Sequence, residues 1–456
     1  MSDLIINVSG LRGVIGETLT LDVAMRYVAA FSASMPSGTF VITRDSRPSG
    51  TILADVIHAV LNAAGRSTID AEIAATPTTG ILIRQFGAVG GIQVSASHNP
   101  IEFNGIKLFS GEGRVIPQKE GAAILEYYRN GKTVWVPHNQ IGTQTICKNT
   151  ISTHRKMIMQ TVDVDAIVER KFKVLLDANH GAGAMLGDWL LESLGCDVII
   201  LGEEPSGQFL HTPEPTAENL IDICNLVKEL NVDIAFCQDP DADRVAIIDA
   251  NGRYVGEEYT ITLCLEHLLR ISENPKHPSH RKKGAVVINC ATSRMNEDIA
   301  NKYGVPIFRS AVGEANVVDL MLEKEAMFGG EGNGGPIDPK VGLVRDSFVG
   351  MALILDAMTA TRKTVAQLVD ELPQYVLVKQ KINADLANVP EILDKTAKTF
   401  RHLPCNRLDG LRIDHGDAWV LLRSSNTEPI IRIFAEAPTN DYANRLCNEI
   451  VRLVNS

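Results

Sequence analysis

Gly91-Ile92-Gln93-Val94-Ser95-Ala96-Ser97-His98-Asn99-Pro100 joins an apolar, strand-like run to a cluster of short polar residues. Proline lacks a backbone donor and restricts the residue before it, so Ser97, His98 and Asn99 are expected in a loop at the end of a strand. Loops at strand ends are where rigid scaffolds hold reactive groups. An ordinary Ser/Asn turn is the alternative for this stretch taken alone.

A strand–helix–glycine–strand pattern precedes this stretch and recurs twice, which indicates βαβ units with glycine at the helix C-terminus. The three copies begin more than 100 residues apart, which favours three related domains over a solenoid. The first copy has a strand at 40–43, a helix at 52–64, Gly65 and a second strand ending at Thr76-Pro77. The others have strands at 174–177 and 198–200 around a helix at 185–194, and strands at 286–289 and 307–308 around a helix at 295–302.

The character of the chain changes after the third copy. Helices are expected at 364–372, 390–400 and 441–453, and strands at 375–378, 419–422 and 430–434, with a loop at 423–429. The sequence therefore predicts an α/β fold with three similar mixed α/β domains at 1–150, 151–253 and 254–370. A smaller α+β C-terminal domain is expected at 371–456.

The composition is that of a soluble globular protein, with 45% hydrophobic and 22% charged residues among 456. A net charge of −11 argues against a large basic face for nucleic acid. No apolar run approaches the ~18 residues that span a bilayer, and the first residues do not resemble a signal peptide. The eight cysteines form no C-x-x-C pair, so we expect reduced thiols in a cytoplasmic protein.

Asp239-Pro240-Asp241-Ala242-Asp243-Arg244 places three carboxylates at alternate positions after the apolar residues 234–236. Such carboxylates can converge on one cation, and oxygen ligands favour a hard ion such as Mg²⁺. An EF-hand is excluded, because Arg244 stands where that loop needs glycine and Ala250 where it needs glutamate. A solvated acidic turn is the remaining alternative.

Two further loops have the composition of ligand sites. Arg423-Ser424-Ser425-Asn426-Thr427-Glu428-Pro429 combines an arginine with small donors, which suits a phosphate group, or else forms a hydroxyl-rich turn. Gly329-Gly330-Glu331-Gly332-Asn333-Gly334-Gly335 sets a carboxylate and an amide among glycines, which suits sugar hydroxyls. A flexible linker is the alternative for this second loop.

Taken together, these stretches resemble the α-D-phosphohexomutase family. Its catalytic serine loop is similar to residues 95–100, with Asn104-Gly105-Ile106-Lys107 following at the family's spacing. Its metal, sugar and phosphate loops are similar to residues 239–244, 330–334 and 423–429. The resemblance implies three similar α/β domains and a fourth of another type around one central cleft; the repeats and the change of character after them predict the same four domains.

The resemblance also implies the roles of individual residues. Ser97 would carry a phosphoryl group, and Mg²⁺ would be held by the three aspartates together with an oxygen of that phosphoserine. The phosphoserine would pass its phosphoryl group to a sugar phosphate, and the resulting hexose bisphosphate would return its other phosphoryl group to Ser97. The catalytic residues would be Ser97, His98, Lys107, Arg12 and Arg244; the metal ligands Ser97, Asp239, Asp241 and Asp243; and the substrate-binding residues Glu331, Asn333, Arg423, Ser425, Asn426 and Thr427.

Three positions depart from the pattern of many bacterial members. Asn333 and Gly335 stand where serine and histidine are common, and Glu314 stands in place of another histidine. This variant resembles a subgroup often assigned as phosphoglucosamine mutase, so we expect interconversion of glucosamine 6- and 1-phosphates. Mannose or glucose phosphates are the alternative substrates. A phosphatase and an inactive sugar-phosphate sensor are the rival functions, and the oligomeric state stays open.

Overall fold

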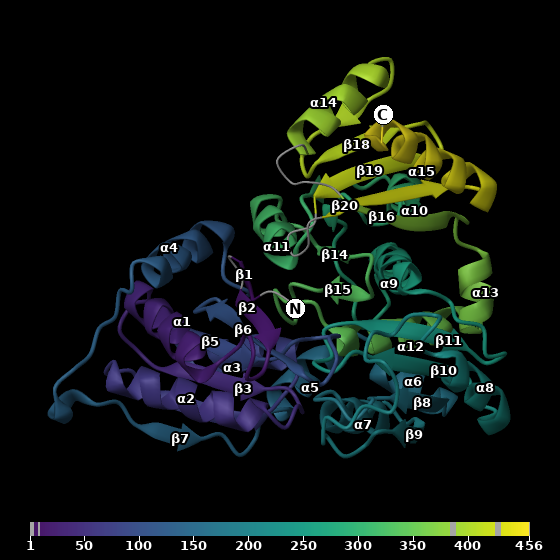
Figure 1. Ribbon diagram of the computed structural model, residues 1–456. Helices are drawn as coiled ribbons and strands as arrows, with labels where there is room; N and C mark the ends of the chain where they lie inside the picture. Colours follow the sequence, from purple (N-terminus) through teal and green to yellow (C-terminus); the bar gives the residue numbers. More distant parts are fainter. Residues whose placement is uncertain (1–3, 8–9, 384–388, 425–429, 456) are drawn as a thin grey trace.

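The structure, a computed structural model, describes residues 4–7, 10–383, 389–424 and 430–455. These residues form four sheets, and we call the part of the chain around each sheet the first to fourth domain. The first and second domains lie side by side at the bottom of Figure 1, the third lies above and between them, and the fourth stands at the top.

The first domain holds a seven-stranded sheet in the order β1-β2-β6-β5-β3-β4-β7. Its strands are β1 (Ile5–Asn7), β2 (Gly10–Val14), β3 (Phe40–Arg44), β4 (Thr68–Ile73), β5 (Gly90–Val94), β6 (Phe103–Ser110) and β7 (Gln144–Ile146). Its helices are α1 (Leu21–Ser34), α2 (Gly50–Ala63), α3 (Thr76–Phe86), α4 (Gln118–Arg129) and the short η1 (His138–Gln140).

The second and third domains each hold a four-stranded sheet. The second contains β8 (Lys173–Asp177), β9 (Asp197–Leu201), β10 (Ile234–Gln238), β11 (Val245–Asp249), α5 (Ser152–Met159), α6 (Val164–Arg170), α7 (Ala184–Ser193) and α8 (Ile221–Leu230). The third contains β12 (Val286–Asn289), β13 (Ile307–Ser310), β14 (Phe328–Glu331), β15 (Gly335–Ile337), α9 (Glu257–Ser272), α10 (Met295–Tyr303), α11 (Glu314–Glu323), α12 (Ser347–Thr361) and α13 (Val365–Asp370).

The fourth domain differs from the others, because its five-stranded sheet is antiparallel throughout, in the order β16-β20-β19-β18-β17. It contains β16 (Val376–Asn383), β17 (Cys405–Asn406), β18 (Leu411–Asp414), β19 (Trp419–Ser424), β20 (Ile430–Ala437), α14 (Val389–Thr399) and α15 (Asn440–Asn455). The predicted layout of three α/β domains and a smaller α+β domain is confirmed.

The first three sheets share one topology. Their matching strands run in the orders β4-β3-β5-β6, β9-β8-β10-β11 and β13-β12-β14-β15. In each set the first three strands are parallel and the last is antiparallel to its neighbour. Each domain therefore has one hairpin at the same place in its sheet, namely β5–β6, β10–β11 and β14–β15.

The central helix α12 is apolar around nearly its whole circumference, and such a helix must be buried on all sides. It packs against α9 of its own domain and against α5, α6 and α7 of the second domain. The second and third domains therefore share a hydrophobic core, which fixes their relative position.

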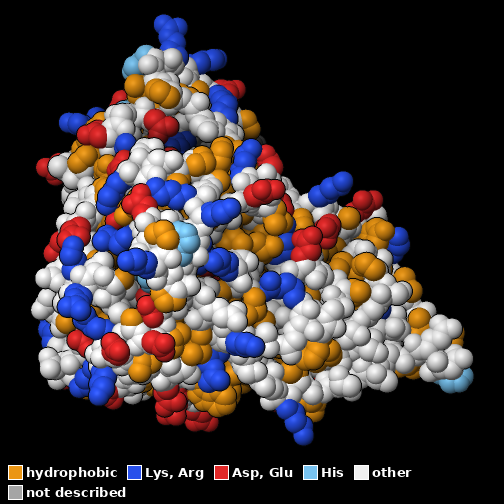
Figure 2. Space-filling view, turned by 180° about the vertical axis from the view of Figure 1, so that it is seen from behind, with side chains coloured by type: hydrophobic (Ala, Val, Ile, Leu, Met, Phe, Trp, Pro, Cys, Tyr) orange, Lys and Arg blue, Asp and Glu red, His pale blue; other side chains and the backbone are white. Residues whose placement is uncertain are grey.

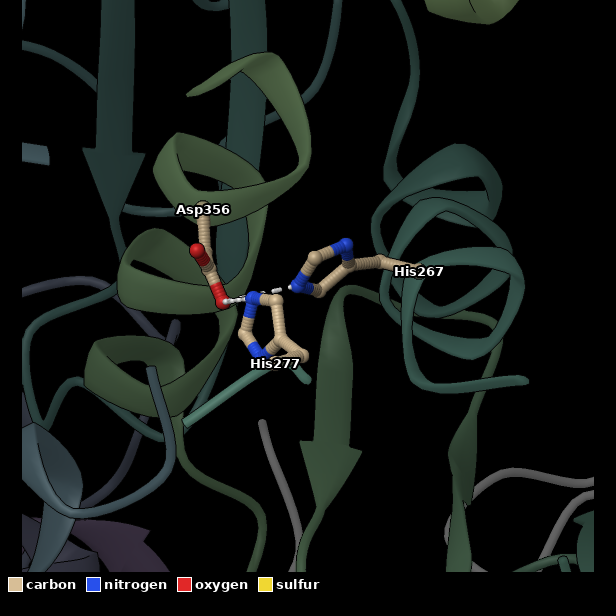
Figure 3. Close-up of side chains that lie close together, drawn as sticks. All are labelled: His267, His277 and Asp356. Atoms are coloured by element: carbon tan, nitrogen blue, oxygen red, sulfur yellow. Dashed lines mark hydrogen bonds and ion pairs between the residues drawn. The ribbon is translucent and has the colours of Figure 1, made fainter. Parts of the chain in front are cut away.

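A buried histidine–aspartate cluster ties α12 to α9 within this core (Figure 3). Nε2 of His267 donates to Oδ2 of Asp356 at 2.9 Å, and Nε2 of His277 lies 3.5 Å from the same oxygen. The amide of Ser279 donates to Nδ1 of His277 at 3.2 Å, so the proton of His277 lies on Nε2 and faces the carboxylate. Metal-bound histidines instead donate through their other nitrogen, so we interpret these three residues as a cluster held by one hydrogen bond and one ion pair.

Most predicted elements are confirmed within a few residues, but one is wrong and one loop begins too early. Thr76-Pro77 does not end a strand: β4 ends at Ile73, and Thr76 begins α3, in whose first turn Pro77 lies. Proline is favoured there because the first helical amides lack partners in any case. The predicted loop at 423–429 begins too early, since β19 continues to Ser424.

Acidic and basic side chains are interspersed over the face of the molecule seen in Figure 2. Among the described residues, none of the helices combines the length and the apolar character needed to cross a bilayer.

Candidate active site

The matching hairpins of the first three domains carry the three predicted loops. The serine loop joins β5 to β6, the metal loop joins β10 to β11, and the glycine loop joins β14 to β15. The loops meet at a cleft of about 570 Å³. Its lining includes the predicted site residues Arg12, Ser97, Lys107, Arg244, Glu331 and Asn333.

Ser97 is buried in the wall of this cleft. Its Oγ donates to Oδ2 of Asp239 at 2.8 Å and lies 3.4 Å from Nδ1 of His98. Its amide donates to Oγ of Ser95 at 2.8 Å, and its carbonyl oxygen accepts from Nη2 of Arg47, also at 2.8 Å. The backbone of Ser97 is therefore held from two sides while its hydroxyl faces the metal loop.

Asp239, Asp241 and Asp243 converge as predicted, with one oxygen of each within 4.8 Å of the others and all three side chains buried. Oδ1 of Asp241 and Oδ1 of Asp243 have no hydrogen-bond partner among the described residues. Buried carboxylate oxygens without partners are costly unless a cation binds them. A set of oxygen ligands suits a hard divalent ion, so these residues fit a metal site.

Neighbouring hydroxyl groups orient Asp241 within this cluster. Its Oδ2 accepts from Oγ1 of Thr76 at 2.6 Å and from Oγ of Ser95 at 3.1 Å. Both donors come from the first domain, and the amide of Thr76 also donates to the carbonyl of Asp241 at 2.9 Å. The first domain therefore fixes one oxygen of Asp241 and leaves the other free.

Cations compensate part of the buried negative charge. The ammonium of Lys107 is paired with Asp241 and lies 3.3 Å from Oδ2 of Asp243. Against the effect of burial, Lys107 lowers the pKa of Asp241, and Arg345 with Lys107 lowers the pKa of Asp243. Burial and the two neighbouring carboxylates raise the pKa of Asp239 well above its usual range. The three carboxylates thus differ in pKa, and Asp239, whose pKa is raised, is the one that accepts a hydrogen bond from Ser97.

Arg12 and Lys107 reach the cleft from the paired strands β2 and β6. Their cross-strand partners are glycines, with Arg12 opposite Gly105 and Lys107 opposite Gly10. The paired glycines leave both long side chains room on one face of the sheet. Nη1 of Arg12 donates to Oδ1 of Asn99 at 2.9 Å, so Arg12 also holds the serine loop.

Arg244 lines the cleft, whereas His98 lies beside Ser97 and is not among the lining residues. Nε of Arg244 lies 3.5 Å from Oδ1 of Asp243. Burial, together with the charges of Arg244 and Arg12, lowers the pKa of His98 well below its usual value. His98 is therefore a neutral imidazole at neutral pH, beside the hydroxyl of Ser97.

Glu331 and Asn333 lie in the cleft, but they are differently engaged. Glu331 is the last residue of β14, and its Oε1 accepts from Nδ2 of Asn289 at 2.8 Å and from the amide of Gly313 at 2.9 Å. Its Oε2 accepts from Nη1 of Arg345 at 2.9 Å. Oδ1 of Asn333 has no hydrogen-bond partner among the described residues, so it is available to a ligand.

Two arginines that were not predicted from the sequence hold parts of the site. Arg345 pairs with Asp243, Glu331 and Glu314. Arg47 holds the carbonyl oxygens of Ser97 and Asn99. No motif contains either arginine, and nothing local indicates that their side chains are buried. The one available signal for Arg345 is its place directly before Asp346, which caps α12.

Arg423 is not among the residues that line this cleft. It is buried in the fourth domain, where its Nε pairs with Oδ2 of Asp409 at 2.9 Å. The predicted phosphate-binding residues Ser425, Asn426 and Thr427 lie outside the described residues.

Family models match the chain along nearly its whole length. They are those of the phosphoglucomutase/phosphomannomutase α/β/α domains I, II and III, over residues 3–134, 152–252 and 257–376. The C-terminal domain model of the same family matches residues 375–453.

Curated relatives and solved structures agree with the family models. The chain is 34% identical to a phosphoglucomutase/phosphomannomutase of Thermococcus kodakarensis, covering 98% of this chain and 97% of the relative. It is 30% identical to a phosphoglucosamine/phosphogalactosamine mutase of Sulfurisphaera tokodaii, covering 98% of each. A phosphoglucomutase/phosphomannomutase family protein of Burkholderia thailandensis has the same fold, with a TM-score of 0.82 at 24% identity over 98% and 96% of the two chains. The chain therefore belongs to the phosphoglucomutase/phosphomannomutase family.

Proposed function

We propose that this phosphohexomutase moves a phosphoryl group between the 6- and 1-positions of a hexose phosphate through a phosphoserine at Ser97. One observation carries the proposal: the Ser97 hydroxyl bonds to a buried aspartate of a three-carboxylate cluster, in a cleft that also contains the glycine loop. A nucleophile, a metal site and sugar-binding groups are thus within reach of one ligand.

The residues of the cleft divide the chemistry among them. Asp239, Asp241 and Asp243, together with Ser97, would hold Mg²⁺, which neutralises charge on the transferred phosphoryl group when bound. Lys107, Arg244 and Arg12 would add positive charge from the chain itself.

Each half of the reaction exchanges one phosphorus–oxygen bond for another. The bond from phosphorus to Ser97 Oγ breaks, and a bond to a sugar hydroxyl forms. The sugar hydroxyl loses its proton, and Oγ gains one. Nδ1 of His98 lies 3.4 Å from Oγ, so this imidazole is placed to exchange that proton. The bisphosphate then turns over and returns its other phosphoryl group to Ser97.

Glucosamine phosphate is the substrate that we propose, with mannose and glucose phosphates as the alternative. A 30% identical relative is named for glucosamine and galactosamine phosphates, whereas a 34% identical relative is named for glucose and mannose phosphates. Asn333 and Gly335 of the glycine loop favour the first assignment by their resemblance to phosphoglucosamine mutases. By the family resemblance alone, Arg423 and residues 425–427 would hold the phosphate that is not reacting, although Arg423 does not line the cleft in this structure.

Mass spectrometry and a turnover assay test the proposal together. The purified protein, incubated with glucose 1,6-bisphosphate and Mg²⁺, should gain one phosphoryl group on the peptide that contains Ser97. It should then convert glucosamine 6-phosphate to the 1-phosphate. Release of inorganic phosphate at the rate of phosphoserine loss would instead identify a phosphatase. Sugar binding without any phosphoryl transfer would identify a sensor.

A further inference from the structure

Arg345 joins the metal loop to the glycine loop across the cleft. Its Nη2 donates to Oδ2 of Asp243 at 2.6 Å, and its Nη1 donates to Oε2 of Glu331 at 2.9 Å. Asp243 belongs to the second domain and Glu331 to the third. One guanidinium group therefore spans the two loops that would hold the metal and the sugar.

The contact with Asp243 is arranged so that one carboxylate oxygen stays available. Arg345 and Lys107 both lie on Oδ2, whereas Oδ1 has no hydrogen-bond partner among the described residues. Arg345 thus holds one oxygen of Asp243 in place; the other lies 3.5 Å from Nε of Arg244 but accepts no hydrogen bond from a described residue, so it can reach a metal ion. This arrangement resembles the outer partners that orient metal-binding carboxylates.

Glu314, the first residue of α11, contacts both the backbone and the side chain of Arg345. The amide of Arg345 donates to Oε1 of Glu314 at 3.0 Å, and its Nε lies 3.3 Å from Oε2. The next residue, Asp346, accepts from two amides at the N-terminus of the central helix α12. Both the backbone and the side chain of Arg345 are therefore fixed.

Gly335 leaves the space that the Arg345 side chain occupies. A Cβ atom at Gly335 would lie 2.5 Å from Cδ of Arg345 and 2.9 Å from its Cγ. The backbone of Gly335 does not have a positive φ, so steric room for Arg345 is the visible reason for a glycine. Gly335 and Glu314, two of the residues that differ from the pattern of many family members, are thus both explained by contacts with Arg345.

The two loops are also joined through the backbone. The amide of Val245, at the end of the metal loop, donates to the carbonyl of Gly334 at 3.0 Å. A displacement of either loop is therefore transmitted to the other.

We propose that Arg345 is a positioning residue that couples sugar binding at Glu331 to metal binding at Asp243. A sugar hydroxyl that donates to Glu331 adds a restraint on this carboxylate, and the contacts of Arg345 carry that restraint to Asp243. Coupling between two binding equilibria is reciprocal, so the sugar strengthens metal binding as much as the metal strengthens sugar binding. The inference rests on the proposed function, because it takes a hexose phosphate as the ligand of the glycine loop.

Calorimetric titration measures this coupling without relying on turnover. Mg²⁺ is titrated into the dephosphorylated, metal-free full-length protein, alone and with saturating glucosamine 6-phosphate. In the wild type we expect the sugar to tighten Mg²⁺ binding by at least about fivefold, the lower end of common coupling factors. Glucosamine, glucose and mannose 6-phosphates are also titrated alone.

Two variants and a control identify the role of Arg345. Arg345→Lys keeps the charge but loses the planar fork that reaches two carboxylates, so the coupling factor should fall to about one. Gly335→Ala displaces the same side chain without changing its charge and should also lower the factor. Arg281→Lys is the control, because Arg281 forms a buried, two-armed ion pair with Asp338 that is not in the cleft. It should keep the wild-type factor.

The outcomes separate the two proposals. Failure of the wild type to bind any of the three sugar phosphates would refute the proposed function, and this inference with it. Sugar binding that leaves the Mg²⁺ affinity of the wild type unchanged would overturn the coupling alone. So would a folded Arg345→Lys protein with the wild-type factor. If Arg345→Lys does not fold, Gly335→Ala decides in the same way.

Discussion

Ser97 has a left-handed backbone, with a φ of 51°, at the point where its hydroxyl meets Asp239. A residue other than glycine in this region costs about 1–3 kcal/mol, and such strain concentrates at active sites. The cost is offset by bonds that use only backbone atoms of Ser97, namely its amide to Ser95 and its carbonyl to Arg47. The loop is therefore fixed independently of the Ser97 side chain.

Ser97→Ala should abolish phosphoryl incorporation and lower turnover by at least about a thousandfold, because the covalent nucleophile is lost. The melting temperature should change little, since the backbone bonds that hold the loop remain. Phosphoryl transfer from radiolabelled glucose 1,6-bisphosphate measures the effect. Ser272→Ala is the control, because Ser272 is the last residue of α9 and does not line the cleft; it should still incorporate label. Full mutase activity in Ser97→Ala would disprove the nucleophile assignment.

Glu258 lies against the glycine loop and should make stability depend on pH. Its Oε2 accepts from the amide of Ser293 at 3.0 Å and would lie 2.0 Å from a Cβ at Gly332. Burial raises the pKa of Glu258 to about 8. The folded protein therefore keeps a proton that the unfolded chain releases near pH 4.5, so this residue lowers stability as pH rises between these values.

Glu258→Gln should raise the melting temperature relative to the wild type, because it removes the cost of ionising a half-buried carboxyl whose pKa is raised. The gain should be near zero at about pH 4.5, grow up to about pH 8 and then level off. Thermal unfolding followed by circular dichroism across this pH range gives the difference. A gain that does not vary with pH would contradict this explanation.

At the scale of the elements, the site is built from three hairpins in equivalent positions, one from each of the first three domains. The hairpins β5–β6, β10–β11 and β14–β15 occupy matching places in their sheets, and each supplies one loop. Their apolar strands are buried, so the loops are anchored at both ends by the cores of their domains. Each loop supplies different side chains, which gives one site a nucleophile, a metal cluster and a sugar-binding loop.

Asp241→Asn in the metal loop should weaken Mg²⁺ binding by at least about tenfold, because a charged oxygen ligand is lost. Mutation of a residue that only orients a metal ligand already lowers metal affinity by about 10–100-fold. Exhaustive chelation of the wild type should stop turnover. Asp249→Asn is the control, since Asp249 lies at the other end of the same hairpin and pairs with Arg253. It should leave the Mg²⁺ affinity unchanged. Activity that survives chelation would exclude this metal site.

At the scale of the whole molecule, the cleft exists because the domains are held in one arrangement. The shared core around α12 fixes the second domain to the third, and Lys107 links the first domain to the metal loop. The fourth domain is attached to the third through Arg412, which donates to the carbonyl of Cys290 at 2.8 Å, and through Glu436, which accepts from the amide of Arg294 at 2.9 Å.

This arrangement also bears on substrate choice. Glu331 would attract the ammonium of glucosamine, but Arg345 already pairs with its carboxylate. We therefore expect only a modest preference, about fivefold in kcat/KM, for glucosamine 6-phosphate over glucose and mannose 6-phosphates. A fivefold ratio corresponds to about 1 kcal/mol, which is the amount by which a charged hydrogen bond is stronger than a neutral one. Parallel kinetic assays of the three sugars give the ratios. A preference for either neutral sugar would refute the substrate assignment and leave the mutase chemistry standing.

The sequence by itself determined the repeated α/β layout and the loops of the first three domains. Their signals are local: apolar strands alternate with helices, and Asp239, Asp241 and Asp243 stand two residues apart after a buried strand. The local reading failed at Thr76-Pro77, because a proline can follow a strand or open a helix. The choice between a strand end and a helix start depends on the packing of α3 and on the hydrogen bond from Thr76 to Asp241, which is 165 residues away.

Only the tertiary structure decided which side chains meet in the cleft. Arg345 and Asp243 are 102 residues apart, and Lys107 and Asp241 are 134 apart. Such pairs form when separate domains bring their loops together, and no short pattern encodes them. The buried charge also depends on this assembly, because the carboxylates of one domain are compensated by cations of two others. The chemistry of each loop could therefore be predicted from the sequence, whereas the contacts between the loops could not.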